Sequence, residues 1–323
     1  MVLRLSLALC LVASCGDSSD GGPPDATPPL PGTVGYLSTG DYDCTAAGPF
    51  VAPSRPHAAD CFADSSCDAP LVAGHRIANP FAPENSLSGL RAAILLGVDI
   101  VETDVRVTSD GVPVLLHDGD VDRTTNGTGA VDAMTLAELQ ALHLETETDD
   151  PAGDFSCDTV PTLDDVFALA RGQIVVELEA KGREGAAAAA QYLSDNDLMD
   201  QAFILCDDNE CEAARAAVAD VPIMTRPNDA AEVDAKLAYD PGPILVHIDP
   251  TSAFLTDEVV SRIHAAEAKV YANAFLVGDA GALASHDLSL YRQMFDDGLD
   301  VIQAEYPHWA LQALGRLTPD DSP

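Results

Sequence analysis

Basic side chains are scarce in this sequence of 323 residues, which has 16 Lys and Arg against 53 Asp and Glu and a formal net charge of -37. A surface of that charge repels the phosphates of nucleic acid and the head groups of anionic membranes, so neither is expected as a partner through charge. Aromatic residues are also few, at 5% of the chain. Aliphatic residues compensate, because apolar types reach 47% of the sequence, which is compatible with a real core.

The apolar run near the N-terminus, Leu5–Val12, is too short to span a bilayer. It follows Arg4 and precedes small residues and Cys15, a pattern typical of an export signal. Val-Ala-Ser-Cys also resembles the lipobox of bacterial lipoproteins, in which the Cys is lipidated and becomes the mature N-terminus. We therefore expect residues 1–14 to be removed and an exported protein, periplasmic or anchored at the outer membrane or cell surface, whose one membrane contact is lipid on Cys15. A plain secretory signal cleaved nearby is the alternative.

Two of the eight cysteines belong to this N-terminal region, which leaves Cys44, Cys61, Cys67, Cys157, Cys206 and Cys211. An even number of cysteines in an exported protein favours disulfides. Cys206 and Cys211 are the easiest pair because only four residues separate them. The other four allow three pairings that the sequence leaves open. A zinc site is the rival interpretation, but the spacings fit no finger or ribbon pattern.

Four segments follow from composition and periodicity. After the signal, residues 15–33 are Ser, Asp, Gly and Pro with almost nothing to bury, which predicts a flexible tether. Residues 34–70 carry three cysteines and little periodicity, which indicates a disulfide-stapled lead-in packed on the main domain. From 71 to 316, strands alternate with helices, and about eight such units predict a TIM (β/α)8 barrel. A doubly wound sheet is the rival, but no Gly-rich dinucleotide fingerprint follows the first strand.

One irregularity concerns the strand count, because nine runs look like strands. The link Thr108–Gly111 between two of them is too short for a helical crossover. Either a helix is missing there or one run lies outside the barrel, and the sequence leaves both open. Two amphipathic helices are expected over 135–144 and 162–170, since each begins at a Thr with an acid three residues later.

Glu102 and Asp104 stand two residues apart on a strand that is otherwise apolar, so both side chains point to the same face. At ~4 Å and an effective dielectric constant of ~20, such a like-charge pair costs on the order of 4 kcal/mol. That cost calls for a positive group between them. The pair is therefore interpreted as half of a metal site.

Several short motifs flank this strand in a fixed order. They are His75-Arg76, Pro83-Glu84-Asn85, Glu102-Thr103-Asp104-Val105, Thr108-Ser109-Asp110-Gly111, His117-Asp118, Arg123-Thr124-Thr125-Asn126-Gly127, Pro161-Thr162-Leu163 and Glu179-Ala180-Lys181. Together they resemble the glycerophosphodiester phosphodiesterase family, a group of TIM-barrel enzymes. The resemblance in motifs covers residues 71–181. The rest of the chain resembles the family only in its alternation of strands and helices.

The resemblance implies a metal site at Glu102, Asp104 and Glu179, which match the family's metal-binding carboxylates. Three oxygen ligands suit one divalent cation, Ca²⁺ or Mg²⁺, better than zinc. The alternative is three exposed acids in an acidic protein. His75 and His117 match the family's catalytic pair, and two imidazoles can divide the base and acid roles that phosphodiester cleavage requires. Which one is the acid stays open.

Other residues are expected around this centre. Arg76 and Lys181 are its positive groups in a very acidic chain and are expected to bind the substrate phosphate, with structural ion pairing as the alternative. Glu84 is expected to orient the metal shell or a His. Asn85 is expected to hold a loop, with capping of a helix N-terminus as the alternative.

The implied reaction is the hydrolysis of small glycerophosphodiesters to sn-glycerol 3-phosphate and an alcohol. Three departures from the family pattern lie at the substrate end: Ile77 where the family has Gly, Asn273 where it commonly has Trp, and Ala304-Glu305 where Thr-Asp is usual. A lysophospholipase D or sphingomyelinase-like activity is one alternative, although no aromatic-rich loop provides the apolar rim that a lipid substrate needs. An anchored binding protein without catalysis is the other. The head group and the oligomeric state stay open.

Overall fold

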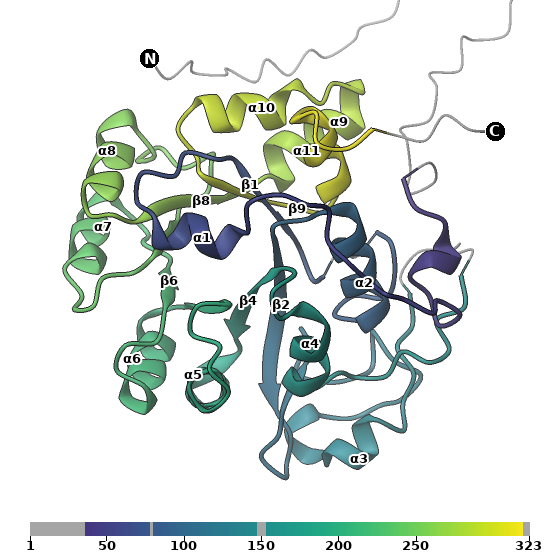
Figure 1. The fold of residues 1–323 in the computed structure, drawn as a ribbon. Helices are drawn as coiled ribbons and strands as arrows, with labels where there is room; N and C mark the ends of the chain where they lie inside the picture. Colours follow the sequence, from purple (N-terminus) through teal and green to yellow (C-terminus); the bar gives the residue numbers. More distant parts are fainter. Residues whose placement is uncertain (1–35, 78–79, 147–152, 319–323) are drawn as a thin grey trace, which may run out of the picture.

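In a computed structural model, eight parallel strands of the described residues close into a barrel (Figure 1). The structure describes residues 36–77, 80–146 and 153–318, so the expected signal and tether lie outside the described residues. The strands are β1 Leu71–Gly74, β2 Ile100–Val107, β4 Val175–Ala180, β5 Ala202–Cys206, β6 Ile223–Thr225, β7 Leu245–His247, β8 Lys269–Asn273 and β9 Val301–Ala304. Because β1 pairs with both β9 and β2, the sheet is closed. The predicted TIM barrel is confirmed and the open doubly wound sheet is excluded.

The ninth strand-like run lies outside the barrel. It is β3 (Pro113–Leu115), which pairs antiparallel with the end of β2. The Thr108–Gly111 link is a tight turn in which Gly111 takes a φ of 83°, a left-handed conformation that favours glycine. No crossover helix is therefore missing at this turn in the described structure.

The connection from β3 to β4 is a long excursion that carries η2 (Val131–Ala133), α3 (Leu136–Leu139) and α4 (Leu163–Ala170). The helix expected over 135–144 is wrong in extent, because α3 is a single turn. Residues 143 and 144 instead pair with Thr125 and Asn126 through backbone hydrogen bonds. Leu139 and Leu144 pack with Val114, Val121 and Val160 in a small separate core. Tertiary packing has overridden the local helical pattern there.

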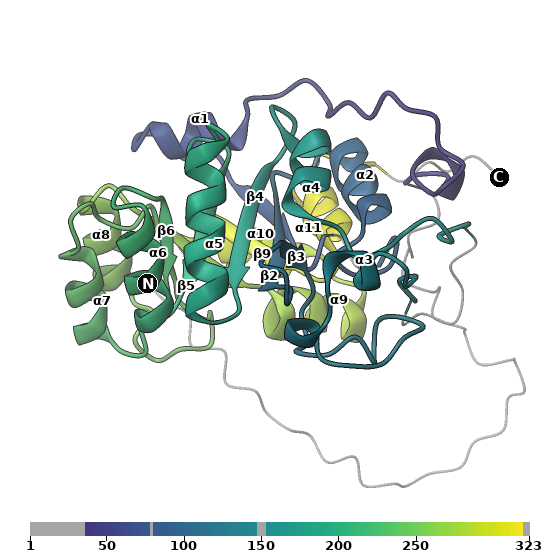
Figure 2. The ribbon, with the colours of Figure 1, turned by 90° about the horizontal axis from the view of Figure 1, so that it is seen from below.

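Helices surround the barrel, as the views from two directions show (Figures 1 and 2). Strand residues such as Val101, Leu178 and Ile204 face the helices in the larger core. The outer helices are α2 Leu87–Leu96, α5 Gly182–Asp195, α6 Asp208–Ala217, α7 Ala230–Leu237, α8 Asp257–Ala265, α9 Ala280–Ser285, α10 Ser289–Asp296 and α11 Pro307–Ala313. A π-helical turn, η3 Phe275–Asp279, follows β8. No helix among the described residues is long and apolar enough to cross a membrane.

The interior of the barrel changes from apolar to polar along its axis. An apolar cluster that includes Ile100, Val175, Phe203, Leu245 and Val301 fills the end at which the strands begin. Toward the ends of the strands, the buried side chains include polar ones such as Glu102, Asp104, Glu177, His247 and Gln303. The carboxyl end of a TIM barrel is where its active site lies, so this polar half is the place to look for chemistry.

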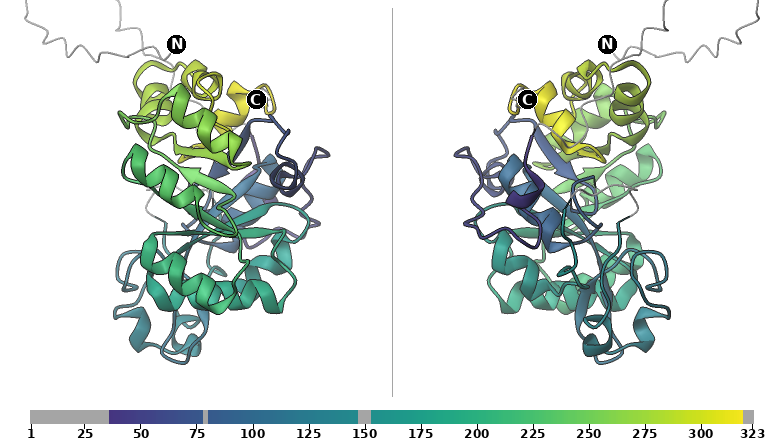
Figure 3. Two further views of the ribbon diagram at one scale, coloured as in Figure 1. Left: turned by 90° about the vertical axis from the view of Figure 1, so that its left-hand side faces the viewer. Right: turned by 90° about the vertical axis from the view of Figure 1, so that its right-hand side faces the viewer.

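The lead-in closes the opposite end of the barrel. Its helix α1 (Ala58–Ala63) packs Ala58 and Cys61 into the interior apolar cluster, and the Phe62 ring meets the Phe203 ring edge-on at 5.7 Å. Further views show this lead-in, coloured purple to dark blue, along one edge of the molecule (Figure 3).

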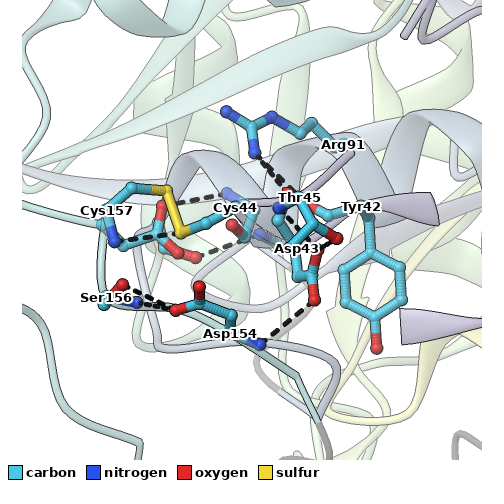
Figure 4. Close-up of a disulfide and its surroundings, with 12 residues drawn as sticks. Tyr42, Asp43, Cys44, Thr45, Arg91, Asp154, Ser156 and Cys157 are labelled. Atoms are coloured by element: carbon cyan, nitrogen blue, oxygen red, sulfur yellow. Dashed lines mark hydrogen bonds between the residues drawn. A yellow bond between two sulfur atoms is a disulfide. The ribbon is translucent and has the colours of Figure 1, made fainter. Parts of the chain in front are cut away.

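All six of the remaining cysteines form disulfides, which confirms the Cys206–Cys211 pair and excludes the zinc rival. Cys61–Cys67 closes a short loop inside the lead-in. Cys44–Cys157 joins the lead-in to the excursion before α4 across 113 residues of sequence (Figure 4).

Candidate active site

Three carboxylates meet at the carboxyl end of the barrel because of strand register. In the parallel pair of β2 and β4, Asp104 lies opposite Glu179 and Glu102 lies opposite Glu177. One oxygen each from Glu102, Asp104 and Glu179 lies within 4.8 Å of the others. Glu102 and Asp104 are buried, while the Glu179 side chain is 27% exposed. The geometry therefore brings together the three acids that the sequence analysis assigned to a metal.

The donor set fits a hard divalent cation. Oε2 of Glu102 accepts a hydrogen bond from the backbone N–H of Arg76 at 2.9 Å, but its Oε1 is buried and accepts none from the described residues. Burial, followed by the neighbouring charges of Asp104, Glu177 and Glu179, raises the pKa of Glu102 well above its usual value. An ionised Glu102 needs a positive partner at that orphaned oxygen. A ligand set made of carboxylate oxygens suits Ca²⁺ or Mg²⁺, which both prefer oxygen ligands.

Lys181 and Asn85 support the same cluster. Nζ of Lys181 lies 2.8 Å from Oδ1 of Asp104 and 3.1 Å from Oε2 of Glu179. Burial lowers the pKa of Lys181, but the two carboxylates outweigh it and the net shift is upward. Asn85 donates from Nδ2 to Oδ2 of Asp104 at 2.9 Å. The helix-cap alternative for Asn85 is wrong, because Ser86 caps α2.

His75 follows β1 and points at the carboxylates. Its Nδ1 lies 2.7 Å from Oε1 of Glu305, and its Nε2 lies 3.9 Å from Oε2 of Glu102. An ionised carboxylate can only accept a hydrogen bond, so Glu305 favours the tautomer with the proton on Nδ1 and a free lone pair on Nε2. The ring also lies 4.8 Å from the Phe275 ring, between centroids.

His117 follows β3 and is held at two points. Its Nδ1 lies 2.7 Å from Oδ1 of Asp118, and its carbonyl oxygen accepts hydrogen bonds from Arg106 at 2.6 and 3.1 Å. A hydrogen bond from Arg123 is the main cause of a lowered pKa at Asp118, so that carboxylate is ionised. The His117 side chain is 34% exposed, which leaves it accessible to a substrate.

Glu84 holds two arginines. Its carboxylate accepts one hydrogen bond from Arg76, at 2.8 Å, and two from Arg123, at 2.8 and 2.9 Å. Burial raises the pKa of Glu84, but these hydrogen bonds outweigh it and the net shift is downward. The contacts of Glu84 in the described structure are thus with Arg76 and Arg123, and its expected role in orienting the metal shell or a His stays a prediction.

Several residues of the site received no role from the sequence. Glu305 was noted only as a departure from the family pattern. Nη2 of Arg226, after β6, lies 3.6 Å from Oε1 of Glu179. Glu177 accepts a hydrogen bond from the Tyr271 hydroxyl at 2.6 Å, and burial raises its pKa to about 8. The one available signal was that Glu177 stands two residues before Glu179, on the same face of its strand.

The departure at Ile77 has a backbone consequence. Ile77 is fully buried and takes a φ of 59°, a left-handed conformation that is an outlier for a β-branched residue. Its N–H donates to the carbonyl oxygen of Glu102 at 2.9 Å, which places this strained residue against the carboxylate strand. A Gly in this position, as the resemblance expects, would avoid the strain.

Comparison with known proteins agrees with this geometry. Residues 75–205 match the glycerophosphoryl diester phosphodiesterase family. A glycerophosphodiester phosphodiesterase of Caldanaerobacter subterraneus is 40% identical over 99 residues, which are 31% of this chain and 40% of the relative. The chain spans less than half the length of the curated relatives that it matches.

Solved structures share the barrel over a longer range. A glycerophosphodiester phosphodiesterase from Agrobacterium tumefaciens is 25% identical, with a TM-score of 0.65 over 75% of this chain and 99% of the other. A phosphodiesterase from Oleispira antarctica, solved in complex with the product sn-glycerol-3-phosphate, is 27% identical, with a TM-score of 0.59 over 76% of this chain and 97% of the other.

Proposed function

We propose that this protein hydrolyses glycerophosphodiesters to sn-glycerol 3-phosphate and an alcohol. The observation that carries the proposal is the meeting of three carboxylate oxygens within 4.8 Å, beside the Nε2 of His75. The family match over 75–205 and the product-bound relative support the same substrate class.

The residues divide the work as follows. Glu102, Asp104 and Glu179 hold one divalent cation, Ca²⁺ or Mg²⁺, which when bound neutralises charge on the phosphate oxygens. Lys181 and Arg76 are the positive side chains that bind the phosphate.

His75 and His117 move the protons. A glycerol hydroxyl next to the phosphate loses its proton to one His while its oxygen forms a bond to phosphorus. The bond from phosphorus to the head-group oxygen breaks, and the other His supplies the proton that this oxygen takes up. Water then opens the cyclic phosphate, with the two proton transfers reversed, and yields glycerol phosphate.

The decisive test is the release of glycerol phosphate from glycerophosphocholine, measured with Ca²⁺, with Mg²⁺ and with a chelator. We expect turnover that the chelator abolishes, and a loss of about 10²- to 10⁴-fold in His75→Ala and His117→Ala. His264→Ala is the matched control, since His264 also pairs with a carboxylate, Asp300, at 2.8 Å but on α8. Turnover in the presence of chelator would remove the metal from the mechanism. Undiminished rates in both variants would favour the binding-protein alternative.

A lipid substrate is the second candidate, and one observation favours it. Leu276 is 70% exposed in the π-helical turn after β8, directly after Phe275, which contacts His75. This gives the rim of the site an apolar residue that the sequence analysis did not anticipate. If a lysophospholipid is the substrate, it is turned over faster than glycerophosphocholine, and Leu276→Asp lowers only the lipid rate. Equal effects on both rates would reject the lipid substrate.

We also propose export through residues 1–14 and lipid attachment at Cys15, which lie outside the described residues. Three disulfides suit an oxidising compartment, which supports export. Mass spectrometry of the mature protein from a bacterial host tests it, because a lipidated Cys15 has a mass that a plain cleaved N-terminus lacks. Cys15→Ser should release the protein from the membrane fraction.

A further inference from the structure

Arg123 lies at the centre of an ionic chain that connects the segments carrying the two histidines. It comes from the excursion after β3, outside the barrel. The turn that presents it is pinned by Thr125, whose hydroxyl donates to the Val121 carbonyl at 2.8 Å and accepts from the Gly127 N–H at 3.1 Å. Thr124 and Thr125 are both buried, so Arg123 leaves a fixed stretch of backbone.

The guanidinium of Arg123 uses both of its edges. Nη1 and Nη2 donate to the two oxygens of Glu84 at 2.9 and 2.8 Å, and Nε donates to Oδ2 of Asp118 at 2.6 Å. This fork of three donors in one plane is a geometry that Arg offers and Lys does not. A single side chain thereby fixes the relative positions of two carboxylates from different segments.

Each of those carboxylates holds a residue of the proposed site. Asp118 places Oδ1 at 2.7 Å from Nδ1 of His117, and Glu84 accepts from Arg76, the neighbour of His75. The formal charges of Arg76, Arg123, Glu84 and Asp118 cancel while His117 is neutral. Removing Arg123 leaves Asp118 free to rotate and its charge uncompensated.

We propose that Arg123 is a positioning residue for His117. Through Asp118 it holds the imidazole in the tautomer with the proton on Nδ1, which leaves Nε2 to exchange a proton with the substrate. Through Glu84 it ties this orientation to that of Arg76. This role rests on the proposed function, because that function makes His117 a proton-transfer residue. The tautomer of His117 can still be measured without any turnover.

Two variants and a control test it. Arg123→Gln removes the charge and the fork, and Arg123→Lys keeps the charge alone. Arg262→Gln is the matched control, because the Arg262 side chain is equally exposed at 33% and lies 2.7 Å from Asp234, on the outer helices. We expect Arg123→Gln to lower kcat about 10- to 100-fold with KM within about three-fold, and Arg123→Lys to fall between it and the wild type.

The pH profile separates positioning from a merely structural role. The charged groups bonded to His117 or to its partner are Arg106, Asp118 and Arg123. With Arg123 removed, Asp118 favours a proton on His117 more strongly. The limb of the kcat/KM profile that His117 contributes therefore moves to higher pH in Arg123→Gln and not in Arg262→Gln.

Nitrogen-15 NMR of labelled histidines provides the readout that is independent of activity, with His117→Gln to assign the signals. We expect the wild type to show the Nδ1–H tautomer at His117 and Arg123→Gln to show a mixture. Wild-type kinetics, pH profile and nitrogen signals in Arg123→Gln would overturn the proposal. If Arg123→Gln does not fold, Arg123→Lys decides, because an unchanged His117 signal and rate there would equally overturn it. An inactive wild type with the expected tautomer shift would refute the hydrolase and leave the positioning role standing.

Discussion

His75 and Glu305 meet across two neighbouring strands, β1 and β9, with Nδ1 of His75 2.7 Å from Oε1 of Glu305. Glu305 is itself fixed by Asp279, whose carboxylate accepts hydrogen bonds from the backbone N–H of Glu305 at 3.0 Å and of Tyr306 at 3.3 Å. The π-helical turn after β8 therefore sets the place of Glu305, and Glu305 sets the orientation of His75.

Replacing Glu305 by Gln should lower kcat by about 10- to 100-fold and change KM little, because the His75 tautomer is then no longer fixed by an obligate acceptor. Steady-state kinetics with glycerophosphocholine measure both constants. Glu258→Gln, an exposed acid on α8, is the control for loss of one negative charge. A wild-type kcat in Glu305→Gln would show that this contact does not matter for turnover.

Binding of Ca²⁺ or Mg²⁺ should raise the melting temperature. A ligand at about 100 times its Kd stabilises the folded state by about 2.7 kcal/mol, which is about 5–10 °C for a domain of this size. Differential scanning fluorimetry with and without each ion measures the shift. Glu102→Gln and Asp104→Asn should abolish it, whereas Glu258→Gln should keep it. A shift that survives both substitutions would place the ion elsewhere.

The meeting of the three carboxylates could be predicted from the sequence because local pattern gave two of them and the family resemblance gave the third. Glu102 and Asp104 share a face through the two-residue period of a strand, and Glu179 lies on β4, the strand that pairs with β2. The closed barrel followed from the alternation of strands and helices in the same way.

What could not be predicted depends on contacts that only the closed fold makes. Glu305 is 230 residues from His75 in sequence, and the pairing of β1 with β9 brings them together. The position of β3 outside the barrel could not be predicted, because its sequence pattern resembles that of the barrel strands. Only the closure of the barrel between β1 and β9 shows which strand is left out. The disulfide between Cys44 and Cys157 likewise connects segments that have no shared periodicity.

His308 should make the protein less stable as the pH falls. It is fully buried among the rings of Tyr36, Phe81 and Trp309, and neither ring nitrogen has a hydrogen-bond partner in the described residues. Burial lowers its pKa to about 3. Between the unfolded pKa of about 6.5 and about pH 3, the unfolded chain binds a proton that the folded chain does not, so the free energy of unfolding drops by about 1.4 kcal/mol per pH unit.

Urea unfolding at about pH 7, 6 and 5, which covers the upper part of that range, measures this dependence. His308→Phe, which keeps the ring, should have a shallower loss of stability below about pH 6.5 than the wild type. His143→Gln, at an exposed site, should retain the wild-type slope. Equal slopes in wild type and His308→Phe would contradict the assignment.

Removing the Cys44–Cys157 disulfide should cost more stability than removing Cys61–Cys67. A disulfide acts mainly by restricting the unfolded chain, and the restriction grows with the length of the loop that it closes. The two loops span 113 and 6 residues. The chain-entropy relation gives about 5 kcal/mol for the first and about 2 kcal/mol for the second, before any change in the folded state.

Hydrogen bonds also hold the two segments that the Cys44–Cys157 disulfide joins. The backbone N–H of Cys44 donates to the carbonyl oxygen of Asp154 at 2.8 Å, and the backbone N–H of Asp154 donates to Oδ2 of Asp43 at 3.1 Å (Figure 4). These hydrogen bonds can persist when the sulfurs are replaced, so most of the loss falls on the unfolded state. Urea unfolding of the double variants Cys44→Ser/Cys157→Ser and Cys61→Ser/Cys67→Ser should therefore show the larger drop in unfolding free energy, and the larger rise in m-value, for the first. The reverse order would mean that the Cys61–Cys67 loop, and the packing of α1 against the interior of the barrel, contributes more to stability than the restriction of the long loop.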